Sequence, residues 1–322
     1  KQAKIMPREV MRNIYRIPVP LPNNPLRELN CYLIRGKDRS LLIDTGFRQE
    51  TCRRALFDGL RELNVRMEDT DILLTHLHSD HTGLLPEVAS ATSRVFIDDL
   101  DRDWIVGSTR FELERQEDAR FAMAGIPPEM LRIASQTHPG RCFAPDPSFD
   151  RYTRLSAGDV LEVGGYRLEV LRTPGHTPSH LCLWMAEQQV MFTGDHVLFD
   201  ITPNITAWIQ MKDALGTYLD SLRKIDAYDV RLALPGHRKT GDFHQRIAQL
   251  LEHHHRRLDE ALSVVKAHPG RPAYDIAGHM TWKIRANSWQ DFPVAQKWFA
   301  VGECMSHLDY LKIGRASCRE RV

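Results

Sequence analysis

The sequence predicts a fold of the α+β class, built from recurrent strands with helices between and after them. Short apolar runs bounded by turn residues occur in both halves of the chain, as expected of strands. Segments with apolar residues at helical spacing separate them, and the longest covers 243–267. The length of 322 residues suits one large domain, or one domain with a smaller appendage.

The first third of the chain predicts two strands, a helix and a third strand. Segments 30–35 and 40–44 are apolar runs separated by a Gly-Lys-Asp turn, which indicates a hairpin. Apolar residues recur at helical spacing over 48–63. The run DILLT at 71–75 is typical of a strand that is buried on both faces.

A polar, amphipathic stretch then interrupts the β-rich pattern. Residues 98–137 predict two or three helices, inserted between strands. Further strands are expected at 159–163, 166–171, 180–185, 189–193 and 230–234. Further helices are expected at 211–225, 243–267, 274–281 and 294–311.

The sequence predicts a main domain, a small C-terminal extension and a tail that is foreign to the protein. We expect a main domain over 1–245 and a small helical extension over 246–311, with a Pro-Gly-Arg-Pro break at 269–272. Residues 312–322 (KIGRASCRERV) match the translation of a sequencing adapter, so we exclude them from the fold. The extension is therefore expected to be truncated.

Composition narrows the classes of function. Hydrophobic residues make 42% and charged residues 26%, which excludes a disordered or fibrous chain. A net charge of +1 supplies no field for non-specific nucleic-acid binding. No apolar run reaches the roughly 18 residues of a membrane helix, so we expect a cytoplasmic protein without a membrane partner. Six scattered cysteines without a CxxC pair predict buried free thiols.

The strongest motif follows the expected strand 71–75 directly and reads HLHSDH. Imidazole and carboxylate groups are ligands of zinc and related divalent ions. Four such groups within six residues predict either two metal centres or one crowded centre. The four candidates are His76, His78, Asp80 and His81.

Three further candidates, His176, Asp195 and His237, also follow expected strands. Each of the two histidines comes after Pro-Gly, a turn that lets the chain leave the sheet and directs the next side chain. All the candidates therefore lie at one kind of place, the end of a strand.

The order of these motifs resembles that of the metallo-β-lactamase superfamily. HxHxDH, the first PGH, the Gly-Asp and the last PGH occur in that order, and LLIDTG around Asp44 matches the early acidic motif. The resemblance covers about 10–245 and implies an αββα sandwich with two divalent ions, Zn²⁺ or else Mn²⁺ or Fe²⁺. It implies that the first metal is held by His76, His78 and His176, the second by Asp80, His81 and His237, and both by Asp195. Asp44 would support the ligands.

The resemblance also implies hydrolysis by a hydroxide shared between the two ions, with Asp80 and Asp195 as catalytic residues. A small ester or thioester is the expected substrate. An endoribonuclease or phosphodiesterase is the first alternative. A mononuclear-iron persulfide dioxygenase using only His76, His176 and Asp195 is the second, and a non-enzymatic scaffold with a bound metal is the third.

The appendages leave several interpretations open. Segment 294–311 resembles the winged-helix-type extension of hydrolases similar to β-lactamase-like protein 2, so RNA stays a weakly supported partner and a homodimer is left open. Loop 201–208 is a candidate substrate loop, and the basic run 253–257 is expected to be a solvated helix face. His180 either lines the site or packs in the core. The aromatic and apolar residues of the insertion either wall the metal cleft or dock the insertion, and they are Trp104, Phe111, Phe121 and Met123.

Overall fold

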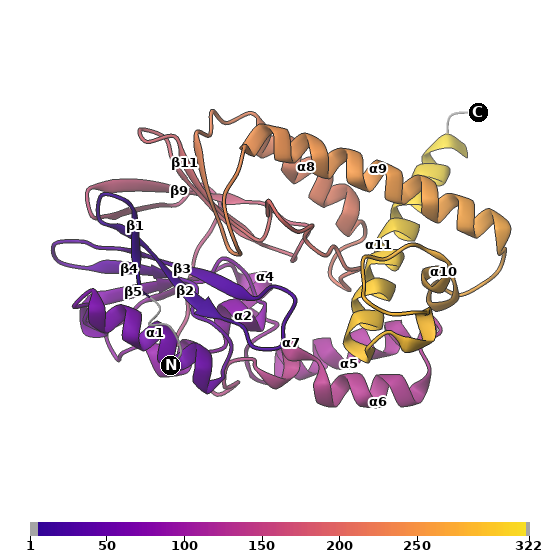
Figure 1. The fold of residues 1–322 in the computed structure, drawn as a ribbon, viewed down its shortest axis with the longest axis horizontal. Coiled ribbons are helices and arrows are strands. Elements are labelled where there is room, and N and C mark those ends of the chain that lie inside the picture. The colour runs from indigo at the N-terminus through magenta and orange to yellow at the C-terminus, as the bar shows by residue number, and fades with distance from the viewer. Residues whose placement is uncertain (1–5, 320–322) are drawn as a thin grey trace.

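The computed structural model describes residues 6–319, and for 313–319 it describes the backbone alone. Two β-sheets face each other, and helices cover their outer surfaces (Figure 1). The αββα sandwich and the α+β class are therefore confirmed. Within the described residues, no helix is long and apolar enough to cross a membrane.

The first sheet contains the N-terminal strands in chain order, antiparallel from β1 to β4 and parallel from β4 to β7. Its strands are β1 (Arg8–Met11), β2 (Ile14–Pro20), β3 (Glu28–Ile34), β4 (Ser40–Ile43), β5 (Thr70–Leu73), β6 (Val95–Ile97) and β7 (Thr153–Arg154). The expected hairpin is β3–β4. The sequence did not indicate β1, β2, β6 or β7.

The second sheet has the order β12-β11-β10-β9-β8, and its β11–β12 pair is parallel. Its strands are β8 (Val160–Val163), β9 (Tyr166–Arg172), β10 (Leu181–Met185), β11 (Val190–Gly194) and β12 (Leu232–Pro235). All five lie within one or two residues of the expected segments. Every strand segment of this sheet was therefore predicted, although its order was not.

Strand β10 shows why buried strands of this fold have continuous apolar sequences. Leu181, Leu183 and Met185 pack into the core between the sheets, whereas Cys182 and Trp184 pack against the helical side. Successive side chains of a strand point to opposite faces, so a strand covered on both faces is apolar at every position. All five residues are buried.

Helices cover the two outer faces. Within α1, Cys52, Ala55, Leu56 and Leu60 form the buried stripe. Helices α8 and α9 cover the other sheet (Figure 1). The helices are α1 (Glu50–Glu62), α2 (Ser79–Thr82), α3 (Leu85–Val88), α4 (Asp99–Arg102), α5 (Gly107–Met123), α6 (Pro128–Thr137), α7 (Pro139–Cys142), α8 (Ala214–Asp226), α9 (Phe243–Ala267), α10 (Ala273–His279) and α11 (Val294–Arg319).

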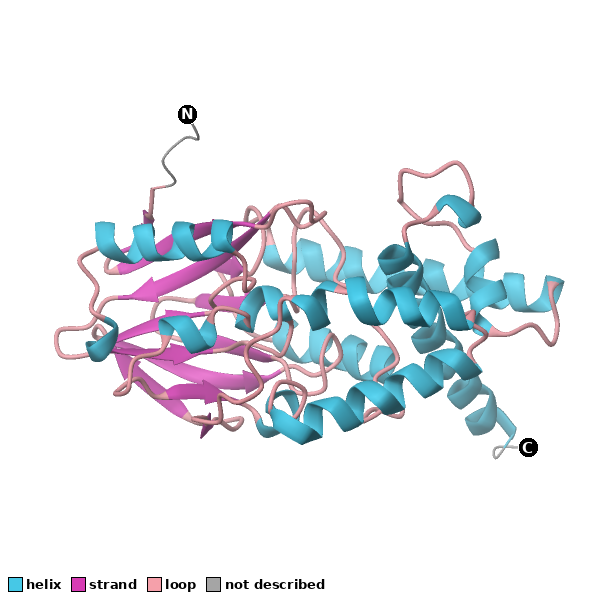
Figure 2. Ribbon diagram, turned by 90° about the horizontal axis from the view of Figure 1, so that it is seen from below, coloured by secondary structure: helices cyan, strands magenta, loops and turns pink. Residues whose placement is uncertain are grey.

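The insertion and the C-terminal helices pack together into one helical body at one end of the molecule, whereas the strands lie at the other end (Figure 2). The Phe121 ring of α5 stacks on the Trp298 ring of α11, with centroids 4.0 Å apart. Phe121 therefore docks the insertion, while Phe111 and Met123 are exposed. The described part of 246–311 contains helices and no strand, so its winged-helix character stays a prediction.

The basic run 253–257 is only in part the solvated face that the sequence predicted, since His255 and Arg256 are exposed. His254 and Arg257 are buried. The Arg257 guanidinium pairs with Glu260 and Glu303 and lies 4.3 Å from the centroid of the Trp282 ring. A buried charge needs such partners. Glu260 is one turn away in α9, whereas Glu303 and Trp282 come from segments that the sequence pattern could not connect.

The cysteine prediction is mostly confirmed. The buried free thiols are Cys31, Cys52, Cys182 and Cys304. Cys142 is a partly exposed free thiol, and the side chain of Cys318 lies outside the described side chains.

Candidate metal centre

The seven ligand candidates all follow strand ends. The loop after β5 carries His76 and leads into α2, and His176 comes four residues after β9. Asp195 directly follows β11, and His237 comes two residues after β12. The fold thus brings together side chains that are up to 161 positions apart in the sequence.

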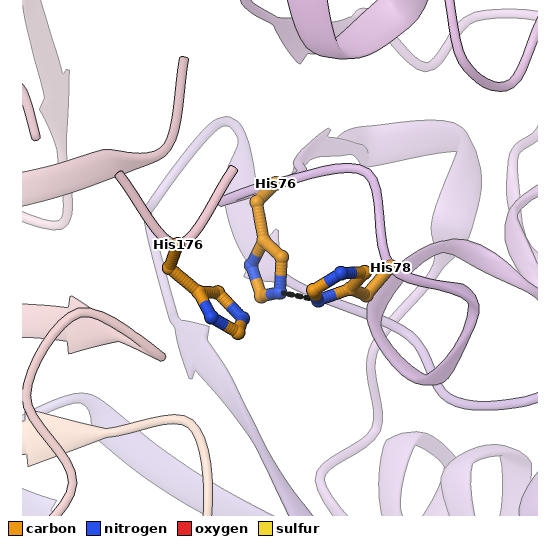
Figure 3. Close-up of side chains that lie close together, drawn as sticks. All are labelled: His76, His78 and His176. Carbon is orange, nitrogen blue, oxygen red and sulfur yellow. Dashed lines mark hydrogen bonds between the residues drawn. The ribbon is translucent and has the colours of Figure 1, made fainter. Parts of the chain in front are cut away.

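The candidates form two groups, and within each group the ligand atoms lie within 4.8 Å of one another. The first group is His76, His78 and His176, whose rings converge from two loops (Figure 3). Nε2 of His76 lies 3.0 Å from Nδ1 of His78. The second group is Asp80, His81, Asp195 and His237.

Asp195 lies between the two groups. Its Oδ2 atom is 3.9 Å from Nε2 of His76 and 3.7 Å from Nε2 of His176. The same oxygen is 3.2 Å from Nε2 of His237, and Oδ1 is 3.4 Å from Nε2 of His81. One carboxylate therefore faces imidazoles of both groups.

Backbone carbonyls orient two of the imidazoles. Nδ1 of His176 donates to the carbonyl oxygen of Asn204, and Nδ1 of His237 donates to that of Glu28, each over 2.7 Å. A carbonyl can only accept, so Nδ1 carries a proton and Nε2 points into the centre, where it is the nitrogen available to a metal ion. These rings are held in the tautomer that binds a metal through Nε2.

Asp44 orients two further imidazoles, as the resemblance implied. Its Oδ2 accepts a 2.7 Å hydrogen bond from Nδ1 of His81 and another, of 2.8 Å, from the hydroxyl of Thr75. The Thr75 hydroxyl has only one proton, so it accepts from Nδ1 of His76, 3.0 Å away. Asp44 thus fixes the His81 ring directly and the His76 ring through Thr75.

Burial and neighbouring charges set the protonation of the centre. Burial lowers the pKa of His78 to about 3 and that of His76 well below its ordinary value. Burial also opposes charge on His237, but Asp195 and Asp80 outweigh it and raise its pKa to about 10. The carboxylates therefore attract positive charge into this cluster, either as a proton or as a metal ion.

Three buried atoms of the centre support a cation. Asp80 Oδ2, Asp195 Oδ1 and His176 Nε2 have no hydrogen-bond partner among the described residues. Unpaired buried polar atoms are costly and rare, and carboxylate oxygens with imidazole nitrogens are a zinc-type donor set. The residues present therefore fit divalent metal ions.

Space requires glycine in both Pro-Gly turns, and in the first turn the backbone conformation requires it as well. Gly175 has a φ of +138°, and a Cβ there would lie 2.5 Å from Cα of Tyr218. A Cβ at Gly236 would lie 2.4 Å from Oδ1 of Asp195. Glycine therefore lets the first turn approach α8 closely and the second turn approach the centre closely.

Other sequence hypotheses have mixed outcomes. His180 is buried outside both groups, and its Nε2 accepts the backbone N–H of Asp195 over 3.1 Å, so it packs and holds Asp195. The Trp104 ring packs on that of Trp208, which lies 6.0 Å from the ring of His78. Sequence reasoning missed Asn204 as a supporting residue, because its contribution is a backbone carbonyl.

The sequence model of the metallo-beta-lactamase superfamily matches residues 25–237. The chain belongs to this superfamily. Solved structures agree: a family member from Thermus thermophilus has a TM-score of 0.77 and 29% identity, with 96% of each chain covered. A beta-lactamase domain protein from Burkholderia ambifaria has a TM-score of 0.81 and 25% identity, covering 97% of this chain and 90% of its own.

Curated relatives in the superfamily include named thioesterases. The beta-lactamase-like protein 2 homolog of Caenorhabditis elegans is 26% identical, over 82% of this chain and 77% of its own length. The human acyl-coenzyme A thioesterase MBLAC2 is 26% identical, over 66% and 73% respectively. An atrochrysone carboxyl ACP thioesterase of Aspergillus fumigatus is 27% identical, over 74% and 59%. The superfamily and these relatives together support a hydrolase with a metal-binding site.

Proposed function

We propose that the protein is a dinuclear, zinc-type hydrolase of small esters or thioesters. The observation that carries the proposal is the position of Asp195, which lies within 3.9 Å of imidazole nitrogens in both groups. The thioesterase names of the relatives favour the thioester. A cytoplasmic location stays a prediction from the sequence.

The residues would share two ions as follows. His76, His78 and His176 would hold the first, Asp80, His81 and His237 would hold the second, and Asp195 would contact both. Such a pair of ions, when bound, lowers the pKa of a shared water and polarises the carbonyl oxygen of an ester or thioester.

The side chains around the ions have their own tasks. Oδ2 of Asp80 is buried 3.2 Å from Nε2 of His237 and has no hydrogen bond among the described residues, so it can accept a hydrogen bond from the attacking water and orient it. His78 is the partly exposed member of the seven candidates, whereas the other six are buried. Substrate would therefore reach the centre from the side of His78, next to Trp208.

The test combines metal analysis with a substrate panel. Protein purified without added metal is expected to contain about two zinc or manganese ions per chain. We expect it to hydrolyse acyl-coenzyme A thioesters in preference to lactones, phosphodiesters and RNA. His237→Ala should lower kcat/KM by at least about 100-fold, because it removes a ligand. His244→Ala, at a half-exposed histidine paired with Asp226, is the matched control.

Other results would overturn the proposal. One iron per chain with oxygen consumption would favour persulfide oxidation. RNA cleavage without thioesterase activity would favour the nuclease. A His237→Ala variant that loses stability, when neither it nor the wild type turns over any substrate of the panel, would favour a non-enzymatic scaffold whose metal is structural.

A further inference from the structure

A buried carboxylate outside the seven candidates joins the loops that follow β5 and β9. Asp101 in α4 has no exposed surface. Its Oδ2 accepts the backbone N–H of Leu77 over 2.9 Å and the hydroxyl of Thr177 over 2.6 Å. These two donors belong to different loops, one after β5 and one after β9.

The second oxygen strengthens the same link. Oδ1 of Asp101 accepts the backbone N–H of Ser179 over 2.8 Å and its hydroxyl over 3.0 Å. The backbone N–H of Asp101 in turn donates to the Ser179 hydroxyl oxygen over 3.0 Å. The carboxylate thus accepts four hydrogen bonds, and no lone pair of either oxygen is left for a metal ion.

The groups that donate to Asp101 lie next to the candidate ligands of the first metal group. Leu77 lies between His76 and His78, and Thr177 directly follows His176. Asp101 therefore fixes the backbone on both sides of the first group. Hydrogen bonds to an ionised acceptor are about twice as strong as neutral ones, so the carboxylate ties the two loops together firmly.

We propose that Asp101 is a positioning residue that sets the geometry of the first metal group without binding the metal. This inference rests on the proposed function, because it assumes that His76, His78 and His176 hold an ion. Outer residues that orient ligands typically change metal affinity by roughly 10- to 100-fold when they are lost. Because Asp101 lies in α4, the start of the insertion would also contribute to the geometry of the metal centre.

Asp101→Asn tests the inference with almost unchanged side-chain volume. The amide replaces one acceptor oxygen with an NH₂ group that would face N–H or O–H donors, so at least one loop loses its anchor. The matched control is Asp71→Asn. Asp71 is also buried and accepts hydrogen bonds from Arg39 and Arg94, but it lies at the opposite end of β5 from the metal centre.

The measurements are zinc retention against a competing chelator and the Tm of metal-loaded and metal-stripped protein. We expect Asp101→Asn to release one of two zinc ions at a chelator concentration roughly 10- to 100-fold lower than wild type does. Its rise in Tm on metal loading should shrink, because stabilisation by a ligand follows its affinity. Asp71→Asn should lower both Tm values and keep the zinc affinity.

The outcomes distinguish a failure of the positioning role of Asp101 from a failure of the proposed function. Equal zinc affinity in wild type and Asp101→Asn would overturn the positioning role. A wild-type protein that binds fewer than two zinc ions would instead overturn the proposed function. If Asp101→Asn does not fold, Thr177→Val removes only the 2.6 Å hydrogen bond to the His176 loop. That variant should still weaken one zinc ion several-fold, and unchanged affinity would refute the inference.

Discussion

The imidazole of His176 donates its Nδ1 proton to the backbone carbonyl of Asn204 over 2.7 Å. The loop that contains Asn204 also returns to the same histidine, since the indole Nε1–H of Trp208 donates to the carbonyl of His176 over 2.9 Å. The expected substrate loop 201–208 therefore supports a ligand candidate from outside. Any element that holds this loop also acts on the metal centre.

Ser306 of α11 is such an element, and Ser306→Ala should weaken both stability and metal binding. Its hydroxyl donates to the carbonyl of Ile205 over 2.6 Å in a fully buried position. The alanine leaves that carbonyl unpaired, which costs about 1–3 kcal/mol of unfolding free energy in urea titrations. Zinc affinity should fall by about 10-fold, because the loop behind His176 loosens.

Ser263→Ala is the control for this prediction. Ser263 is exposed on α9, and its hydroxyl bonds only to a carbonyl one turn back in the same helix. Neither stability nor zinc affinity should change by a measurable amount. Equal zinc affinity in the Ser306 variant and wild type would mean that α11 does not influence the centre.

Gly236→Ala should disturb the metal centre through Asp195 and His81. The new methyl group would stand 2.4 Å from Oδ1 of Asp195 and 3.0 Å from Cε1 of His81, so Asp195 must move. We expect metal analysis to give at most one ion per chain, with an unchanged far-ultraviolet circular dichroism spectrum. Gly270→Ala, where a Cβ has nothing within 4 Å, should keep both ions. Two retained ions in Gly236→Ala would contradict the position assigned to Asp195.

The ligand set could be predicted because each member carries a local signal. His76, His176 and His237 are chemically distinctive side chains that follow apolar runs, two of them after Pro-Gly. Asp101 has no such signal, since it is one aspartate in a polar stretch and its importance arises only when two distant loops meet at it. Glu28 supplies a backbone carbonyl, which no residue type reveals.

The strands, too, include some that the sequence could predict and some that it could not. Strand β10 was predictable because burial on both faces makes every residue apolar. The hairpin of β1 and β2 lies at a sheet edge, and it includes partly exposed Arg16 and two prolines, so alternation is weak. Strand β7 has only two exposed residues, Thr153 and Arg154, and is defined by its pairing with β6 rather than by its composition.

The stability of the protein should fall at acidic pH through a buried pair of histidines. Nδ1 of His254 lies 3.2 Å from Nε2 of His307, and both rings are buried between α9 and α11. Burial lowers the pKa of His307 from its ordinary 6.5 to about 4, and Arg257 adds to this effect. Burial lowers the pKa of His254 well below its ordinary value.

The sign of the effect follows from these directions. Between pH 6.5 and pH 4 the unfolded chain binds more protons than the folded chain, so the unfolding free energy falls as the pH falls. His307 alone accounts for up to about 3 kcal/mol of this loss. His307→Gln should flatten the pH dependence measured by urea unfolding, whereas His244→Gln should keep the wild-type slope. A steep, unchanged slope in His307→Gln would assign the acid sensitivity to other groups.

The last prediction concerns the expected domain boundary after residue 245. The chain 1–245 would lose α10 and α11, which cover the buried Phe121 and Ile126 of the insertion. It would also cut α9 within its first turn, before Ile247 and Leu250 enter the main core.

We therefore expect the chain 1–245 to aggregate or to unfold at a much lower temperature, because burying those side chains contributes about 1.5–3 kcal/mol each. A chain that ends at residue 311 keeps all of these contacts, and its Tm should equal that of the full chain if 312–322 is foreign. A folded, monomeric 1–245 with wild-type Tm would mean that the extension is an independent domain. An altered Tm for the chain ending at 311 would instead show that the tail contributes to the fold.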